Sequence, residues 1–389
     1  MTPPCPSPLV RDEIERLPTY NAGLAAARFE AIYGVPLRAK LDSNENPLGP
    51  SPDAISAALA AVKGIGRYPD ASGMTLRVAL ADRLGASADR VILGNGSEDL
   101  IGVIYRTVLR PGDHVVTVCP SFGLHEFAAQ ACGARVTKVP FTPDWHFPVA
   151  GLAAAMAEGA RVLIISSPSN PAGPAISPDD FATLVAATPA GTLIVFDEAY
   201  VEYLDESMHF DALAVLSASG HPWISLRTFS KAFGLAGARV GYGLAHDPQL
   251  VAAMSKVRNP FAVNLVAEAA ATAALEDAKH LARGVELAQS ERRRLSRALA
   301  AMGFPCAPSQ TNFLFFDCGR PATEIAEALR RQGVLIKAWM EPPFTNHARV
   351  TLGQPTENDL FLDAMSSAAA HQALDDTAEP KAQPAAPRL

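Results

Sequence analysis

The stretch of sequence that best indicates the fold is RTFSKAFGLAGAR, residues 227–239. It follows an apolar run, residues 223–226, which is typical of a buried strand. Lys231 lies just beyond that strand, in an apolar segment interrupted by two glycines. Loss of solvation in such a setting lowers the pKa of a lysine and makes its neutral amine available for Schiff-base chemistry. Ser230 and Arg239 add a neutral donor and a planar cation, two residue types that hold phosphate.

Length, composition and charge narrow the class of protein. A chain of 389 residues with 49% hydrophobic and 19% charged residues is ordinary for a globular protein of two domains, or of one large domain with an appendage. The net charge of −7 argues against a nucleic-acid partner, because nucleic acids bind basic surfaces. The five cysteines are scattered and lack metal-ligand spacing, so we expect a reducing compartment and no metal site.

The ends of the chain carry no pattern typical of export or of a membrane protein. Four prolines fall within residues 1–8, where a signal peptide would need an apolar run. No stretch reaches membrane-spanning length without polar interruption. We therefore expect a cytoplasmic protein without a membrane partner.

Strand-like segments recur along the first two thirds of the chain, each followed by a residue able to bind a ligand. The segments end at Gly96, Pro120, Asn170, Asp197 and Lys231, and after Pro120 the candidate ligand-binding residue is Phe122. In open α/β sheets ligands collect at the carboxyl ends of the strands, so these residues are expected to meet at one edge. The pattern predicts an α/β fold with a mostly parallel central sheet.

The turn at Gly96, Ser97 and Glu98 leads from a strand into a helix. Free backbone N–H groups and the helix dipole make such a turn a candidate anion site. The alternative is a helix capped by Ser97, without a ligand. A dinucleotide site is disfavoured because Asp99 stands where that motif requires glycine.

Three further residues have chemistry that suits a flat heteroaromatic cofactor. Asp197 directly follows a buried strand, where a carboxylate needs a partner such as a protonated pyridine nitrogen. Tyr200 lies close enough to bond a phenolic oxygen of the same ring. Phe122 provides a stacking face, although an aromatic residue at this position is also typical of a core.

These motifs resemble, in order and from about Tyr20 to Asn358, those of the fold-type-I pyridoxal-phosphate aminotransferases, in the form found in histidinol-phosphate aminotransferases. The resemblance implies a three-layer sandwich with a mostly parallel central sheet and a smaller α+β domain. It implies a division into an N-terminal arm (1–40), a large cofactor-binding domain (41–262), a small domain (263–372) and a disordered tail (373–389).

The resemblance also assigns roles at the cofactor. Pyridoxal 5'-phosphate would be carried by Lys231, which also moves the substrate proton, while Asp197 and Tyr200 complete the catalytic group. The remaining cofactor contacts implied by the family are Gly96, Ser97, Glu98, Phe122, Asn170, Ser230, Arg239 and, across the interface of a homodimer with shared active sites, Tyr68.

Substrate contacts follow from the same resemblance, with an amino donor and a 2-oxo acid as small-molecule partners. They are Tyr20, Asn44, Asn170, Lys337 and Arg349. Two positions depart from the family pattern. Ala172 replaces a threonine that does not contact the cofactor, and Lys337 replaces an arginine that helps to bind the substrate phosphate.

The expected reaction is transamination of histidinol phosphate with 2-oxoglutarate, in histidine biosynthesis. Because lysine binds phosphate as a point charge and not as a fork, an aromatic amino acid donor is the alternative. Decarboxylation of an amino-acid phosphate would use the same lysine, aspartate and phosphate turn. A transcription regulator would need a basic helix-turn-helix segment, and the first 40 residues are too short and proline-rich for one. The sequence at Gly96 disfavours a dinucleotide-dependent oxidoreductase.

Overall fold

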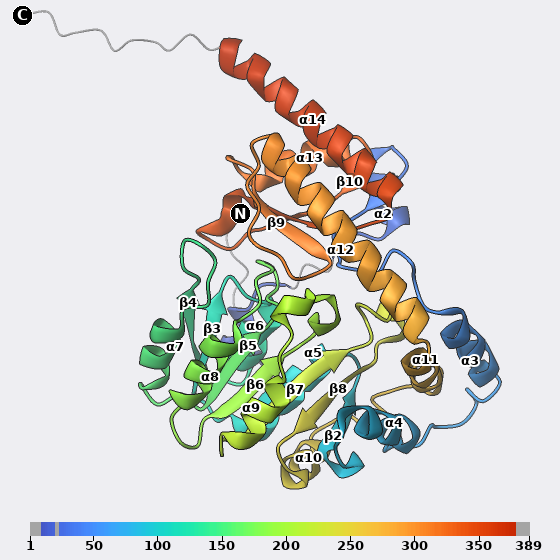
Figure 1. The fold of residues 1–389 in the computed structure, drawn as a ribbon, viewed down its shortest axis with the longest axis vertical. Coiled ribbons are helices and arrows are strands. Elements are labelled where there is room, and N and C mark those ends of the chain that lie inside the picture. Colours follow the sequence, from blue (N-terminus) through green and yellow to red (C-terminus); the bar gives the residue numbers. More distant parts are fainter. Residues whose placement is uncertain (1–8, 20–22, 379–389) are drawn as a thin grey trace, which may run out of the picture.

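The computed structural model describes residues 9–19 and 23–378 and contains a large sheet with helices on both faces (Figure 1). Its seven strands are ordered β2-β8-β7-β6-β5-β3-β4. Only β8 runs antiparallel to its neighbours. The strands are β2 (Val91–Gly94), β3 (His114–Cys119), β4 (Arg135–Pro140), β5 (Val162–Ser166), β6 (Leu193–Asp197), β7 (Trp223–Thr228) and β8 (Gly241–Ala245). The predicted α/β class is confirmed.

The inner strands are apolar on both faces because each face packs against helices. Along β5, Val162 and Ile164 join one buried cluster, whereas Leu163 and Ile165 join the other. The first cluster contains side chains of α5 (Ser97–Val108), α6 (Gly123–Ala131) and α10 (Pro248–Ser255). The second contains side chains of α4 (Met74–Leu84), α7 (Val149–Met156), α8 (Pro178–Ala186), α9 (Ala212–Ala218) and α11 (Leu265–Glu276).

A smaller set of strands and helices lies above the large sheet in Figure 1. Strands β11 (Lys337–Ala338), β12 (His347–Thr351) and β9 (Phe313–Asp317) form an antiparallel sheet, and β1 (Ala39–Lys40) pairs in parallel with β10 (Val334–Leu335). A third cluster of buried residues combines these strands with α12 (Ala278–Ala301), α13 (Ala322–Arg330) and α14 (Pro355–Ala378). Helix α12 directly follows α11 in the chain, with Asp277 between them.

The remaining helices lie in the N-terminal part of the described chain. They are α1 (Asp12–Glu15), α2 (Ala26–Tyr33) and α3 (Pro52–Val62), the last of which agrees with the predicted helix over 52–63. Helix α3 starts with Pro52 and is capped by the Ser51 side chain, a favourable helix start. The division of the chain into four parts stays a prediction. Helix α11 falls in the predicted small domain (263–372), but it packs against α3 and α4 of the predicted large domain.

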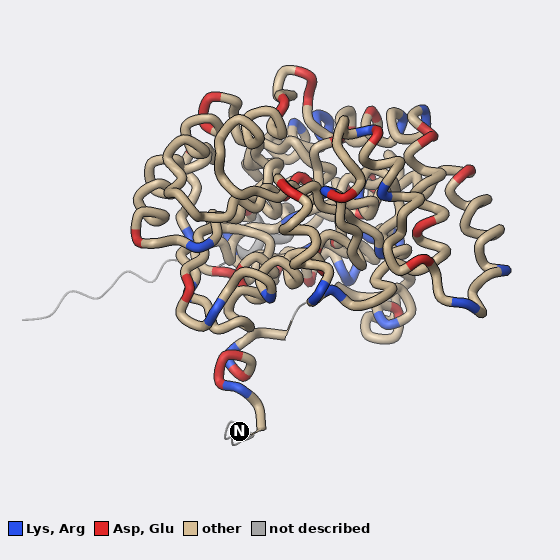
Figure 2. Tube along the Cα trace, turned by 90° about the horizontal axis from the view of Figure 1, so that it is seen from below, with Lys and Arg blue, Asp and Glu red and all other residues tan. Residues whose placement is uncertain are grey.

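Charged residues of both signs are interspersed along the chain (Figure 2). Across residues 9–19 and 23–378, no helix is both long and apolar enough to cross a bilayer. The proline- and alanine-rich tail predicted over 373–389 lies mostly outside the described residues.

Candidate active site

Three of the predicted site residues come together at the carboxyl edge of the large sheet. Strands β5, β6 and β7 are parallel neighbours, so the chain segments that follow them emerge side by side. Asp197 is the last residue of β6, whereas Asn170 and Lys231 follow β5 and β7 within a few residues. The parallel register is thus what assembles residues that are far apart in the sequence.

Lys231 lies in a largely enclosed position beside Tyr200. Its Nζ donates a hydrogen bond to the Ser43 carbonyl oxygen at 3.2 Å and lies 5.8 Å from the centre of the Tyr200 ring. Burial, together with the positive charges of Arg349 and Arg239, lowers the pKa of Lys231 to about 8. The lowered pKa expected from the apolar sequence is confirmed.

Asp197 is buried and held by two donors. Its Oδ1 accepts from the backbone N–H of Ala199 at 3.1 Å, and its Oδ2 lies 3.1 Å from His125 Nε2. The other ring nitrogen of His125 lies 3.0 Å from Ser121 Oγ. Sequence reasoning missed His125, although its place in the first turn of α6, three residues after Phe122, was a usable signal. This chain of polar groups fixes the direction in which the Asp197 carboxylate points.

The predicted anion turn has the expected geometry but a different cap. Helix α5 begins at Ser97, and Gly96, with φ of +83°, occupies the cap position without a side-chain bond. The interpretation of Ser97 as the cap is therefore wrong, and its N–H belongs to the free donors of the first turn. Arg239 reaches the same place, with Nη1 donating to Ser230 Oγ at 3.3 Å and Nη2 lying 3.2 Å from Glu98 Oε1.

Glycine is required where strand β8 passes this turn. A Cβ atom at Gly241 would lie 2.3 Å from the Ser97 backbone nitrogen, and one at Gly96 would lie 2.5 Å from Arg239 Nη2. Both distances are far below van der Waals contact, so any side chain at either position would push the groups apart. The absence of side chains lets a helix N-terminus, a hydroxyl and a guanidinium converge on one small volume.

Arg349 forms the opposite wall, from the small antiparallel sheet. Its Nη1 donates to Asn170 Oδ1 at 2.6 Å and its Nη2 donates to the Asp42 carbonyl oxygen at 2.8 Å. Arg349 lies inside strand β12, where it is the register partner of Lys337 on β11. Burial and the charge of Arg349 lower the pKa of Lys337 to about 8.

Asn44 links the two walls. It adopts a positive φ of 55°, its Nδ2 donates to Tyr200 Oη at 2.9 Å, and its N–H donates to Thr351 Oγ1 at 2.9 Å. The Nδ2 of Asn312 donates to the Asn44 carbonyl oxygen at 3.1 Å. Thr351 and Asn312 were not predicted, because their contribution depends on strands that are remote in sequence.

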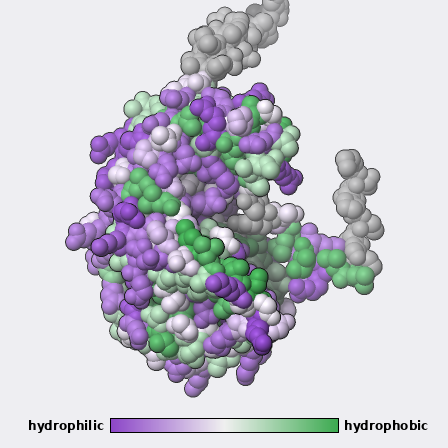
Figure 3. Space-filling model, turned by 90° about the vertical axis from the view of Figure 1, so that its right-hand side faces the viewer, coloured by the Kyte–Doolittle hydropathy of each residue, from purple (hydrophilic) through white to green (hydrophobic). Residues whose placement is uncertain are grey.

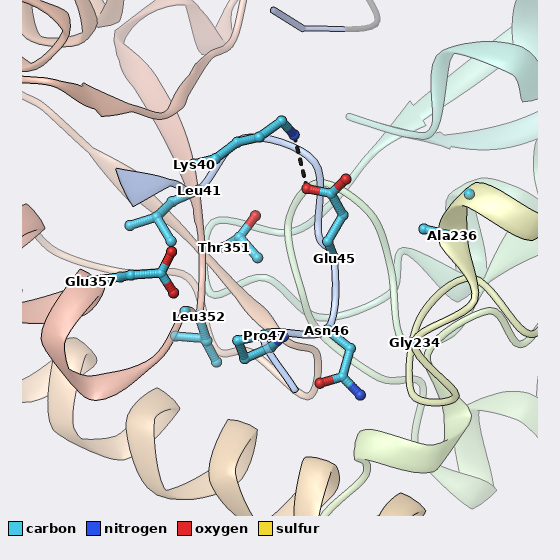
Figure 4. A pocket seen from close by; sticks show the side chains of 12 residues that line it. Lys40, Leu41, Glu45, Asn46, Pro47, Gly234, Ala236, Thr351, Leu352 and Glu357 are labelled. Atoms are coloured by element: carbon cyan, nitrogen blue, oxygen red, sulfur yellow. Dashed lines mark hydrogen bonds and ion pairs between the residues drawn. The ribbon is translucent and has the colours of Figure 1, made fainter. Parts of the chain in front are cut away.

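Next to this site lies a cavity of about 390 Å³, drawn in Figure 4. It is bounded by the segment 40–47, by the turn 234–237 that follows Lys231, and by residues 351–357. Lys40 and Glu45 face one another at this cavity, with Nζ and Oε2 2.8 Å apart. The cavity therefore lies between the two parts of the fold, beside the turn that follows Lys231 and the end of strand β12, which carries Arg349.

The three predicted aromatic contacts have different outcomes. Phe122 lies just before α6, with its ring edge-on to His125 at a centroid distance of 5.6 Å. Tyr68 is 82% exposed, and its ring stacks on that of Phe261 at a centroid distance of 4.5 Å. Tyr20 lies outside the described residues.

A mostly parallel sheet that brings a lysine, a carboxylate, an amide and a glycine-lined anion turn to one edge, beside a smaller α+β part, defines the class of fold-type-I transferases. The chain belongs to the aminotransferase class I and II family, whose model matches residues 39–365.

Its relatives include two rhizobial proteins. Histidinol-phosphate aminotransferase 1 of Mesorhizobium japonicum is 47% identical over 92% of this chain and 98% of its own length. Histidinol-phosphate aminotransferase 3 of Rhizobium meliloti is 47% identical over 92% of this chain and 97% of its own length. Among solved structures, a histidinol-phosphate aminotransferase from Sinorhizobium meliloti in complex with pyridoxal-5'-phosphate is similar, with 30% identity, a TM-score of 0.86, and coverage of 94% of this chain and 99% of that one.

Proposed function

We propose that this chain is a pyridoxal-phosphate-dependent transaminase that exchanges the amino group between histidinol phosphate and 2-oxoglutarate, in histidine biosynthesis. The relatives at 47% identity carry the name of this activity. The structural observation that carries the proposal is the cross-strand pair of Lys337 and Arg349. Two neighbouring cations beside the proposed site suit a substrate that ends in a phosphate dianion. A cytoplasmic location remains a prediction from the sequence.

The residues at the sheet edge fit pyridoxal phosphate. The close approach of the backbone at Gly96 and Gly241 places the N–H groups at the start of α5 beside Ser230 and Arg239, and together these groups would bind the phosphate. Glu98 contacts Arg239 at the same place. Asp197, buried and oriented by His125, suits a protonated pyridine nitrogen. Tyr200 and Asn170 would contact the ring oxygen, and Phe122 would stack on the ring.

When bound, pyridoxal phosphate supplies an electron sink that stabilises negative charge at the substrate α-carbon. The protein supplies the proton transfer. Lys231 Nζ would hold the cofactor and, once released from it, would take the proton from the substrate α-carbon and deliver it to the cofactor carbon, a transfer that needs the neutral amine favoured by burial of Lys231. Asp197 would keep the ring nitrogen protonated by holding a negative charge beside it.

Arg349 and Lys337 would bind the anionic end of either substrate. The bond of Arg349 to Asn170 places the guanidinium within reach of the same ligand as the amide. In this arrangement Arg349 binds the carboxylate of glutamate or 2-oxoglutarate through its two prongs, and Lys337 adds a point charge for the phosphate. Tyr20 and Asn44 complete the proposed substrate contacts. The side chain of Asn44 is oriented by its hydrogen bond to Tyr200.

The active unit in this proposal is a homodimer. Tyr68 projects from a face with several exposed apolar side chains, on α3 and α4 and the segment between them (Ile55, Leu59, Val62, Ile65, Met74 and Val78). Figure 3 views the side of the molecule on which α3 lies and shows apolar patches there. Apolar area of this kind supports a protein partner, and Tyr68 from a second copy would then contact the cofactor phosphate.

The test compares amino donors. The protein loaded with pyridoxal phosphate is mixed with histidinol phosphate, L-phenylalanine or L-glutamate, and the change of cofactor absorbance is followed in a single turnover. We expect histidinol phosphate and glutamate to react fast and phenylalanine slowly. A faster reaction with phenylalanine would assign an aromatic aminotransferase, and release of carbon dioxide from a donor would assign a decarboxylase. A Lys231→Ala variant controls for non-enzymatic exchange.

A further inference from the structure

A single lysine on the edge strand of the large sheet joins that sheet to the segment that bears Lys337. Lys138, on β4, donates to Glu126 Oε2 on α6 at 2.8 Å and to Glu341 Oε1 at 2.8 Å. Glu126 lies on α6, which packs against the large sheet, whereas Glu341 lies between β11 and β12 of the small sheet, 203 residues from Lys138. The two bonds are equal in length, but only the second connects the two parts of the fold.

Glu341 has further bonds on both sides of this contact. Its Oε1 accepts from Cys119 Sγ at 3.5 Å, and its Oε2 accepts from Trp339 Nε1 at 3.3 Å. Burial, and next the carboxylate of Glu341, raises the pKa of Cys119 to about 12, so the thiol keeps the proton that it donates. Glu341 is thus held by a cation, a thiol and an indole at once.

Both ends of this connection lie next to the proposed active site. Cys119 is the last residue of β3 and lies three residues before Phe122. Glu341 follows Lys337 by four residues on the chain segment that continues β11. The Glu341 contacts therefore join the segment that carries the cofactor-facing aromatic to the strand that carries the substrate-facing lysine.

An aromatic cluster lies beside this polar bridge and spans the same gap. Trp145, in the loop between β4 and α7, approaches Phe315, Phe344 and His347 with centroid distances of 5.8 to 5.9 Å. Phe315 also meets Trp339 edge-on at 6.0 Å. Because this packing stays in place when one polar contact is removed, a Glu341 variant is expected to fold.

We propose that Glu341 is a positioning residue for substrate binding: by tying the segment after β11 to Lys138 and Cys119, it fixes Lys337 relative to the cofactor site. The assignment rests on the proposed function, since it takes Lys337 as the ligand of a substrate phosphate. Lysine binds phosphate as a point charge, and its attraction falls with distance, so its contribution depends on how near its backbone is held to the phosphate.

The experiment compares Glu341→Gln with Glu126→Gln in the holoenzyme. Each substitution removes one carboxylate from the same lysine, but only the first alters the contact of Lys138 with the segment between β11 and β12. We expect the KM for histidinol phosphate to rise about 3- to 10-fold in Glu341→Gln with kcat within about 2-fold, and to change less than about 2-fold in Glu126→Gln. Lys138→Met should resemble Glu341→Gln, and the double variant should be no worse than either.

A second readout does not depend on activity. Hydrogen exchange of the backbone in residues 337–346 should be faster in Glu341→Gln than in the unsubstituted protein, and unchanged in Glu126→Gln. Equal effects of the two glutamate variants, or additive effects in the double variant, would overturn the proposal. If the unsubstituted enzyme does not react with histidinol phosphate, the proposed function fails, while the exchange data still decide whether Glu341 holds this segment.

Discussion

At the residue scale, the Lys231 amine has a pKa of about 8 in the folded protein, below its ordinary value of 10.5. Between these two values the unfolded chain binds more protons than the folded one. Stability therefore rises with pH across that window, and the charged lysine destabilises the apoprotein below it. The same burial that makes the amine reactive thus costs stability at neutral pH.

A Lys231→Met substitution should stabilise the apoprotein at pH 7, by on the order of 1–3 kcal/mol, and the gain should shrink as pH approaches 10.5. Urea unfolding at several pH values measures this difference. Lys256→Met, at an exposed lysine that ends α10, is the matched control and should have little effect. A Lys231 variant no more stable than the unsubstituted apoprotein at pH 7 would contradict the argument.

His125 is the residue whose importance is visible only in the structure. Replacing it with leucine leaves the buried Asp197 Oδ2 and Ser121 Oγ without their shared partner, a loss worth about 1–3 kcal/mol. We expect His125→Leu to lower kcat/KM about 10- to 100-fold and to change the pH dependence of the absorbance of bound cofactor. Ser121→Ala, which keeps the bond to Asp197, should have a smaller effect on both measurements.

At the element scale, the close passage of β8 over the start of α5 builds the anion turn. Gly241→Ala would place a Cβ atom 2.3 Å from the Ser97 nitrogen and separate strand from helix. We expect at least about a 10-fold loss of affinity for pyridoxal phosphate, with destabilisation of about 1–3 kcal/mol, measured by cofactor titration and thermal unfolding. Gly237→Ala, with no atom within 4 Å of the added Cβ, is the control. Equal behaviour of the two variants would show that the contact is unimportant.

At the scale of the whole molecule, the exposed Tyr68 leaves the proposed site incomplete in one chain. Mixing subunits that carry Tyr68→Ala with subunits that carry Lys231→Ala tests whether a second copy supplies the tyrosine. Half of the dimers are then hybrids, each with one intact site, so activity should recover to about a quarter of the unsubstituted value. Inactivity of the mixture, with hybrids confirmed by mass, would mean that Tyr68 acts within its own subunit, and full activity of the Tyr68→Ala homodimer alone would place Tyr68 outside the site.

The sequence predicted more of the site than of its surroundings. Lys231, Asp197 and Asn170 were recognisable because each follows an apolar strand, and that local pattern survives folding. The cap of α5 is Gly96 and not Ser97, the alternative that the sequence offered, since element boundaries depend on the cap geometry. His125, Thr351 and Glu341 were missed because their partners lie 72 to 307 residues away.

The sequence by itself determined the class of fold, the family and the order of ligand-binding residues at the strand ends, because hydrophobic period, glycines and short motifs are local properties of the chain. Only the tertiary structure decided which of these residues face one another. The link from His125 to Asp197, the register of Lys337 with Arg349 and the bridge from Lys138 to Glu341 all require strands and helices from distant segments to pack. The apolar sequence around Lys231 predicted a lowered pKa, but the burial that lowers it and the nearby charge of Arg349 both come from packing of distant segments.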